Sequence, residues 1–131
     1  MITESLVARD LGHIGVTKLE VVSSMHDRKA RMAARANAFV ALPGGFGTLD
    51  ELAELLTWAQ LGLHRKPCAV LNVGGYFDSL LAFLDRAADE QLLRPENRAL
   101  LLVESDPVRL VERFRAYTPP AVETWLRRGL L

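Results

Sequence analysis

Residues 43–51 read PGGFGTLDE, a stretch that joins closely spaced glycines to a threonine and two acids. A loop that enters a helix presents backbone N–H groups without intrahelical acceptors, and the helix dipole favours an anion there. Gly44, Gly45 and Gly47 would let a phosphate approach the backbone without interference from a Cβ atom. The spacing matches neither the Walker A loop nor the dinucleotide fingerprint. Phosphate binding is modestly favoured over a tight strand-to-helix turn, which would use the same glycines.

The threonine and acids of this stretch also have a purely structural interpretation. Thr48 and Glu51 have the spacing of a capping box, in which each side chain satisfies a backbone N–H at the start of a helix. This would explain Glu51 without catalysis. Asp50 cannot face Glu51 on a helix, because adjacent side chains diverge. A glycosidase that uses two facing carboxylates is therefore not available within this motif.

A second stretch with chemical potential is SMHDRK, residues 24–29, which opens a run of basic residues. Arg28 and Lys29 fall in the first turn of a predicted helix, where they could meet a bound phosphate. The guanidinium of Arg28 can bind a phosphate or carboxylate bidentately. Arg31 and Arg35 lie further along, and for them a solvated basic stripe is as good an interpretation.

Other chemistries find little support. The histidines His13, His26 and His64 lack the spacing of metal ligands, so no metal is expected. No serine lies in a G-x-S-x-G elbow, which leaves serine hydrolase chemistry unsupported. Cys68 is the only cysteine and begins an apolar run, so we expect a small buried hydrophobe rather than a nucleophile.

A third distinctive stretch is NVGGYF, residues 72–77. Tyr76 and Phe77 of this stretch, together with Trp58, could stack on a nucleobase. Packing in the core or in an interface is the commoner use of aromatic side chains, and we favour it.

The elements that must position these stretches follow from the alternation of short apolar runs with helical patterns. Strands are predicted at 19–23, 38–42, 68–73 and 99–103. Helices are predicted at about 25–36, 48–61, 76–90, 106–116 and 120–129, with Ser24 and Asp27 marking the start of the first. This alternation predicts an α/β fold: one Rossmann-like domain over 1–131, a parallel sheet with helices on both faces.

The predicted arrangement places the three stretches together. Ligands of open parallel sheets bind outside the carboxyl ends of the strands, and each stretch directly follows a predicted strand. Residues 1–18 contain no convincing strand, which leaves a small four-stranded sheet with an exposed edge. Such an edge promotes association, so we expect either a missing N-terminal part or a partner that covers it.

Composition sets the wider limits. The chain has 131 residues, 16 basic and 16 acidic, so no net field favours nucleic acid or an anionic membrane. No apolar stretch approaches the about 18 residues needed to cross a bilayer. We expect a cytoplasmic protein with neither a nucleic-acid nor a membrane partner.

The motifs together resemble one known family. PGGFGTLDE resembles the P-G-G-x-G-T-x-x-E signature of the Lonely Guy family, the cytokinin riboside 5′-monophosphate phosphoribohydrolases, and SMHDRK resembles its second signature. TWAQLGLHRKP (57–67) and LNVGGYFDSLL (71–81) are similar to the segments that follow. The resemblance implies hydrolysis of the N-glycosidic bond of N6-modified adenosine monophosphates, or of AMP, to free base and ribose 5-phosphate.

The resemblance also implies residue roles. Arg28 and Glu51 would be the catalytic pair: Glu51 would stabilise the ribosyl cation or activate water, and Arg28 would orient it and the substrate. No residue suggests itself as the acid that protonates the departing base. No cofactor is implied. The substrate would be bound by Met25, Lys29, Pro43, Gly44, Gly45, Phe46, Gly47 and Thr48.

Members of the family form at least homodimers, so we expect the same assembly here. They begin with a further strand–helix–strand unit, and the present chain is expected to lack it. The label lysine decarboxylase that many relatives carry is unsupported, because the chain is too short for a pyridoxal-phosphate fold and no Schiff-base lysine is identifiable. The alternative interpretation is a non-catalytic nucleotide-binding or carrier module, and a third is an inactive remnant with a purely structural loop.

Overall fold

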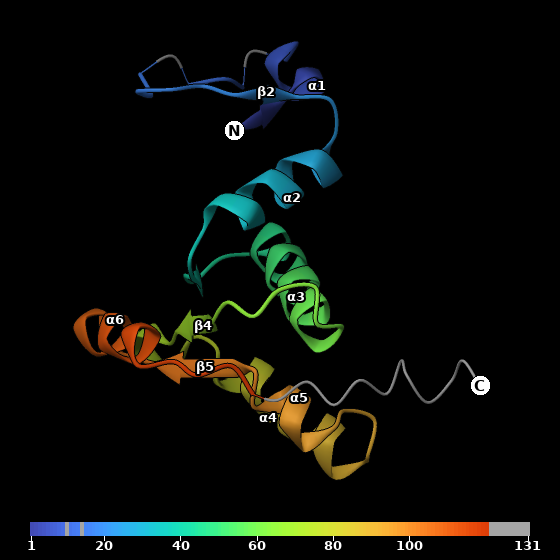
Figure 1. Ribbon diagram of the computed structural model, residues 1–131, viewed down its shortest axis with the longest axis vertical. Coiled ribbons are helices and arrows are strands. Elements are labelled where there is room, and N and C mark those ends of the chain that lie inside the picture. Colours follow the sequence, from blue (N-terminus) through green and yellow to red (C-terminus); the bar gives the residue numbers. More distant parts are fainter. Residues whose placement is uncertain (10, 14, 121–131) are drawn as a thin grey trace. The chain divides into compact units, whose positions relative to one another are not determined.

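The computed structural model describes residues 1–9, 11–13 and 15–120 (Figure 1). The chain divides into two compact units: Met1–Ala36, called the first unit, and a second unit that begins at Asn37. Each contains parallel strands that alternate with helices. The predicted α/β, Rossmann-like class is confirmed, and the grouping of the whole chain into a single domain stays a prediction.

The first unit consists of β1 (Ile2–Thr3), α1 (Glu4–Val7), β2 (Val21–Val22) and α2 (Met25–Arg35). β1 pairs with β2 in parallel, with Ile2 opposite Val21 and Thr3 opposite Val22. The prediction that residues 1–18 lack a strand was therefore wrong. A strand of two residues, one of them the buried and polar Thr3, leaves no apolar periodicity to detect.

The second unit contains β3 (Phe39–Ala41), α3 (Phe46–Gln60), β4 (Cys68–Leu71), the 3₁₀ turn η1 (Val73–Gly75), α4 (Asp78–Asp89), α5 (Pro95–Arg98), β5 (Leu101–Glu104) and α6 (Pro107–Arg115). Its three strands form a parallel sheet in the order β3-β4-β5. A four-stranded sheet was predicted, but the run at 19–23 pairs with β1 instead. Residues 121–129 of the last predicted helix lie outside the described residues.

The core of the second unit explains how its loops are held. Leu52 of α3, Val70 of β4, Leu101 of β5 and Phe77 form one buried cluster. Since β3, β4 and β5 follow one another across the sheet, right-handed crossovers place α3 and α4 on the same face. The starts of both helices are thereby anchored at the carboxyl ends of the strands.

Among the helices of the described part, none combines the length and apolar character that crossing a membrane would require.

Candidate active site

The glycine loop lies between β3 and α3, and it differs from the prediction in one respect. Helix α3 begins at Phe46 with Gly45 as its N-cap, and no side chain caps it. Thr48 is therefore the third helical residue rather than the cap, and the predicted capping box with Glu51 was wrong. The physical reason is that glycine is itself an acceptable N-cap, which allows the helix to begin earlier than the threonine.

The glycines of the loop are required for different reasons. A Cβ atom at Gly44 would collide with the Thr48 hydroxyl, so packing explains this glycine. A Cβ atom at Gly45 or Gly47 would meet no heavy atom within 4 Å. Gly45 has a φ of −103° and Gly47 lies inside α3, so neither needs a left-handed backbone. Internal packing thus accounts for Gly44 alone, which favours the close approach of a ligand at the other two.

Glu51 follows the loop by a little more than one helical turn. It shares a helix face with Gly47 and Thr48, because residues three and four apart are neighbours on a helix. Glu51 is half-buried, whereas the adjacent Asp50 is exposed. Burial of Leu52 in the core fixes the rotation of α3 about its axis. The site thus combines first-turn N–H groups, suited to an anion, with one carboxylate on the same face.

A residue from the third stretch joins this site. Tyr76 Oη donates a hydrogen bond to the Gly44 carbonyl oxygen at 2.7 Å. Phe77 is buried in the core, which confirms the packing interpretation for it. The bracing contact of Tyr76 was missed by sequence reasoning. One signal in the sequence could have found it. Tyr76 follows β4, the glycine loop follows β3, and these two strands are neighbours in the sheet.

The predicted site residues of the first unit lie at the start of α2. Ser24 is the N-cap and accepts a hydrogen bond from the Asp27 amide at 3.1 Å, as predicted. Arg28 is half-buried, and its Nε donates to the Met1 carbonyl oxygen at 3.0 Å. Met25 and Lys29 belong to the same two turns. Since Arg28 and Glu51 belong to different units, their catalytic pairing stays a prediction.

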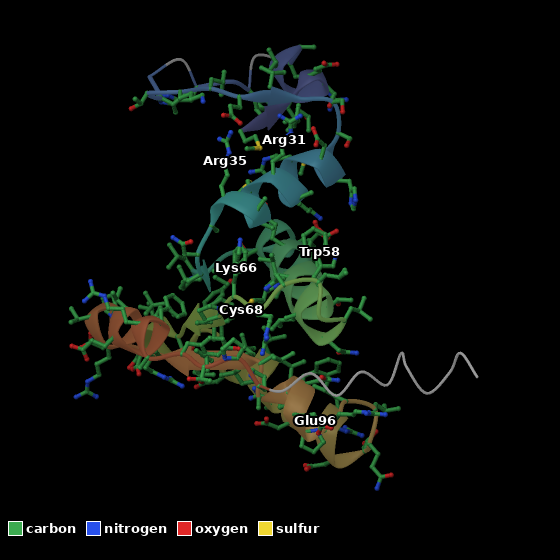
Figure 2. The ribbon with its side chains drawn as sticks, viewed as in Figure 1. Arg31, Arg35, Trp58, Lys66, Cys68 and Glu96 are labelled. Carbon is green, nitrogen blue, oxygen red and sulfur yellow. The ribbon has the colours of Figure 1, made fainter. Side chains whose placement is uncertain are left out.

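Arg31 and Arg35, the basic residues further along α2 that Figure 2 labels, form surface ion pairs. Arg31 pairs with Asp27 at 3.1 Å and Arg35 pairs with Glu20 at 2.6 Å. The hydrogen bond from Arg35, followed by that from Lys18, lowers the pKa of the Glu20 carboxyl. The structure supports a structural interpretation of Arg31 and Arg35.

Cys68 and His64 have structural explanations. Cys68 is 1% exposed, as predicted, and burial raises the pKa of its thiol to about 12, which keeps it neutral and unreactive. His64 has its Nε2 within 2.8 Å of the Leu55 carbonyl oxygen. No group of three or more metal-binding side chains is found within residues 1–9, 11–13 and 15–120.

Comparison with known proteins links this chain to a family. The family model described as "Possible lysine decarboxylase" matches residues 1–114. The chain is 44% identical over 119 residues to the probable cytokinin riboside 5′-monophosphate phosphoribohydrolase LOGL6 of Oryza sativa subsp. japonica, with 91% of the chain and 48% of the relative covered.

Two further relatives are also named phosphoribohydrolases. LOG7 of Arabidopsis thaliana, a cytokinin riboside 5′-monophosphate phosphoribohydrolase, is 45% identical over 91% of the chain and 55% of its own length. The probable phosphoribohydrolase LOGL3 of rice is 49% identical over 81% of the chain and 51% of its own length. The chain spans about half the length of these curated relatives. Because the family model matches most of the sequence, the chain belongs to the family so described, the Lonely Guy family.

Proposed function

We propose that the chain acts as a phosphoribohydrolase on cytokinin riboside 5′-monophosphates or AMP, releasing the free base and ribose 5-phosphate. The observation that carries the proposal is the start of α3, where Gly45 and Gly47 leave the backbone open to a ligand beside Glu51. Relatives that are 44–49% identical bear the name of this activity. The family description names a lysine decarboxylase, but these curated relatives are named phosphoribohydrolases.

In the proposed reaction, the first turn of α3 binds the 5′-phosphate through its unpaired N–H groups. Holding the phosphate fixes the ribose relative to the Glu51 carboxylate, which reduces the entropic cost of reaching the transition state. The bond between C1′ and the base nitrogen breaks, and the water oxygen bonds to C1′. Water supplies one proton to the departing base and its hydroxyl to the sugar.

Glu51 has the main electrostatic role in this proposal. Positive charge develops on the ribosyl ring as the base departs, and a fixed carboxylate stabilises that charge or accepts a proton from water. Arg28 is proposed, from the family resemblance, to orient Glu51 and the substrate. Met25, Lys29 and the loop residues Pro43, Phe46 and Thr48 are proposed as substrate contacts on the same basis. A homodimer is likewise proposed as the assembly.

The first prediction concerns the charge of Glu51. Glu51→Gln keeps the size of the side chain and removes its charge, so we expect kcat for AMP and isopentenyladenosine monophosphate to fall about 100-fold or more. Asp50→Asn is the matched control, because it removes the same charge from the adjacent, exposed position of the same helix. Free base is measured chromatographically, and circular dichroism verifies that each variant is folded.

Two outcomes would contradict this proposal. Equal activity of wild type and Glu51→Gln would remove Glu51 from the chemistry. A folded wild type that binds AMP without releasing base would instead indicate the non-catalytic nucleotide-binding module.

A further inference from the structure

The NVGGYF stretch has no role in the proposed chemistry, yet its geometry is tightly specified. It forms the turn from β4 to α4, and Gly74 and Gly75 have φ values of 58° and 73°. This left-handed region favours glycine. A Cβ atom at Gly75 would lie only 2.6 Å from an Asp78 carboxylate oxygen. Both glycines are therefore required by the turn itself.

Asn72 locks this turn at both ends. Its Oδ1 accepts a hydrogen bond from the Phe77 amide at 2.8 Å, and its Nδ2 donates to Asp78 Oδ1 at 2.7 Å. The Asn72 backbone amide donates to the Glu104 carbonyl oxygen of β5 at 2.8 Å. One side chain thus joins the end of β4 to the start of α4, while its backbone remains attached to the sheet.

The locked turn presents Tyr76 to the glycine loop. The Tyr76 ring packs edge-on against Phe77, with ring centroids 5.2 Å apart and planes at 87°. Phe77 belongs to the core cluster that also contains Leu52 of α3. Phe77 therefore connects the core, and with it α3, to the Tyr76 ring, which is itself largely exposed. From this position Tyr76 Oη donates to the Gly44 carbonyl oxygen.

This contact fixes one peptide unit of the loop. The carbonyl of Gly44 and the N–H of Gly45 belong to a single planar trans peptide and point in opposite directions. A peptide between two glycines has unusual rotational freedom. Holding the Gly44 carbonyl against Tyr76 restricts that freedom and determines where the Gly45 N–H points, at the N-cap of α3.

We propose that Tyr76 is a positioning residue for the phosphate site, acting through the Gly44–Gly45 peptide and held in place by Asn72. The inference rests on the proposed function for the identity of the ligand. The bracing of the loop itself is a property of the ligand-free chain, so the two can be tested separately.

The test uses Tyr76→Phe, which removes the hydroxyl and keeps the ring packed against Phe77. Tyr117→Phe, at the other tyrosine of the chain, is the matched control. Hydrogen exchange of residues 42–49 is measured without ligand, and affinities for AMP and adenosine are measured by calorimetry. Loss of one exposed hydrogen bond predicts loop exchange about threefold faster and AMP binding about threefold weaker, with adenosine affinity unchanged.

Each outcome decides the inference. Unchanged exchange and unchanged AMP affinity would overturn it and leave the proposed function intact. Equal weakening of AMP and adenosine would overturn it too, because phosphate positioning affects AMP alone. A wild type that binds AMP without hydrolysing it would refute the enzyme while the AMP-specific effect of Tyr76→Phe still supported the inference. A wild type that binds neither ligand would overturn the proposed function and the role of Tyr76 in a phosphate site, whereas the exchange measurement would still decide whether Tyr76 braces the loop.

Discussion

At the scale of single residues, the three glycines of the loop are explained by different physical reasons. Gly44 is close to the Thr48 hydroxyl and admits no side chain. Gly45 and Gly47 have space around the position of a Cβ atom, and neither has a positive φ. Glycine inside a helix costs about 1 kcal/mol relative to alanine, so its presence at Gly47 implies a compensating use.

Gly47→Ala should therefore have opposite effects on stability and on binding. Alanine restricts the unfolded chain and suits the helix, so we expect the free energy of unfolding to rise by about 0.5–1 kcal/mol. The added methyl group obstructs the approach of the phosphate, so AMP affinity should fall about tenfold. Denaturant unfolding and calorimetry measure the two effects.

Gly44→Ala provides the contrast for that experiment. Because its methyl group would meet the side chain of Thr48, it should lower stability rather than raise it. If Gly47→Ala gained stability and bound AMP as tightly as wild type, the ligand-based explanation of Gly47 would be wrong.

At the scale of elements, helix starts are built in two ways. Ser24 caps α2, and Asp106 caps α6 by accepting hydrogen bonds from the Val108 and Arg109 amides. Helix α3, which begins the proposed phosphate site, has only Gly45 at its cap and no side-chain acceptor there. An anion bound at this end would take the place of the missing cap.

The contribution of the Ser24 cap to the stability of α2 should be measurable. Ser24→Ala leaves the Asp27 amide without its side-chain acceptor, so we expect the first unit to lose about 1 kcal/mol. Hydrogen exchange of the α2 amides measures this loss locally. Ser23→Ala, one residue earlier and outside the cap, is the control, and an equal effect of both variants would refute the capping role.

At the scale of the whole molecule, acid should weaken both units through named carboxylates. The hydrogen bond from Arg35 holds the pKa of Glu20 below its usual value in the first unit. In the second unit, hydrogen bonds from the Ser105 and Asp106 amides hold the pKa of Glu104 below its usual value. A carboxyl whose pKa is lower in the folded state binds fewer protons there than in the unfolded state, so its contribution is lost as pH falls.

We therefore expect the free energy of unfolding to be insensitive to these groups above their usual pKa of 4.5 and to fall as pH decreases below it. Denaturant unfolding between about pH 7 and pH 3 measures this loss. Glu104→Gln should make the acid slope shallower, with Glu112→Gln on α6 as the control. An unchanged slope in Glu104→Gln would contradict the assignment.

Sequence patterns predicted β2 to β5 and the helices α2, α3, α4 and α6, and missed the short β1, α1 and α5. Helix α2 ends within one residue of its predicted limit, and β3 and β4 lie inside the predicted runs. The two-residue β1 was missed, because so short a strand carries no period. The start of α3 was misplaced by two residues, because the threonine offered a stronger local signal than the glycine that caps the helix.

The sequence by itself determined the family, the order of the longer helices and of the strands from β2 onward, the buried Cys68 and the stretches at the carboxyl ends of the strands. These properties depend on local composition and short spacings, which a linear pattern records. The tertiary structure alone decided that Arg31 and Arg35 form ion pairs, that packing requires Gly44 but not Gly47, and that Tyr76 braces a loop 32 residues away. Contacts of that kind arise from how the core orients separate elements, and no local pattern encodes the orientation.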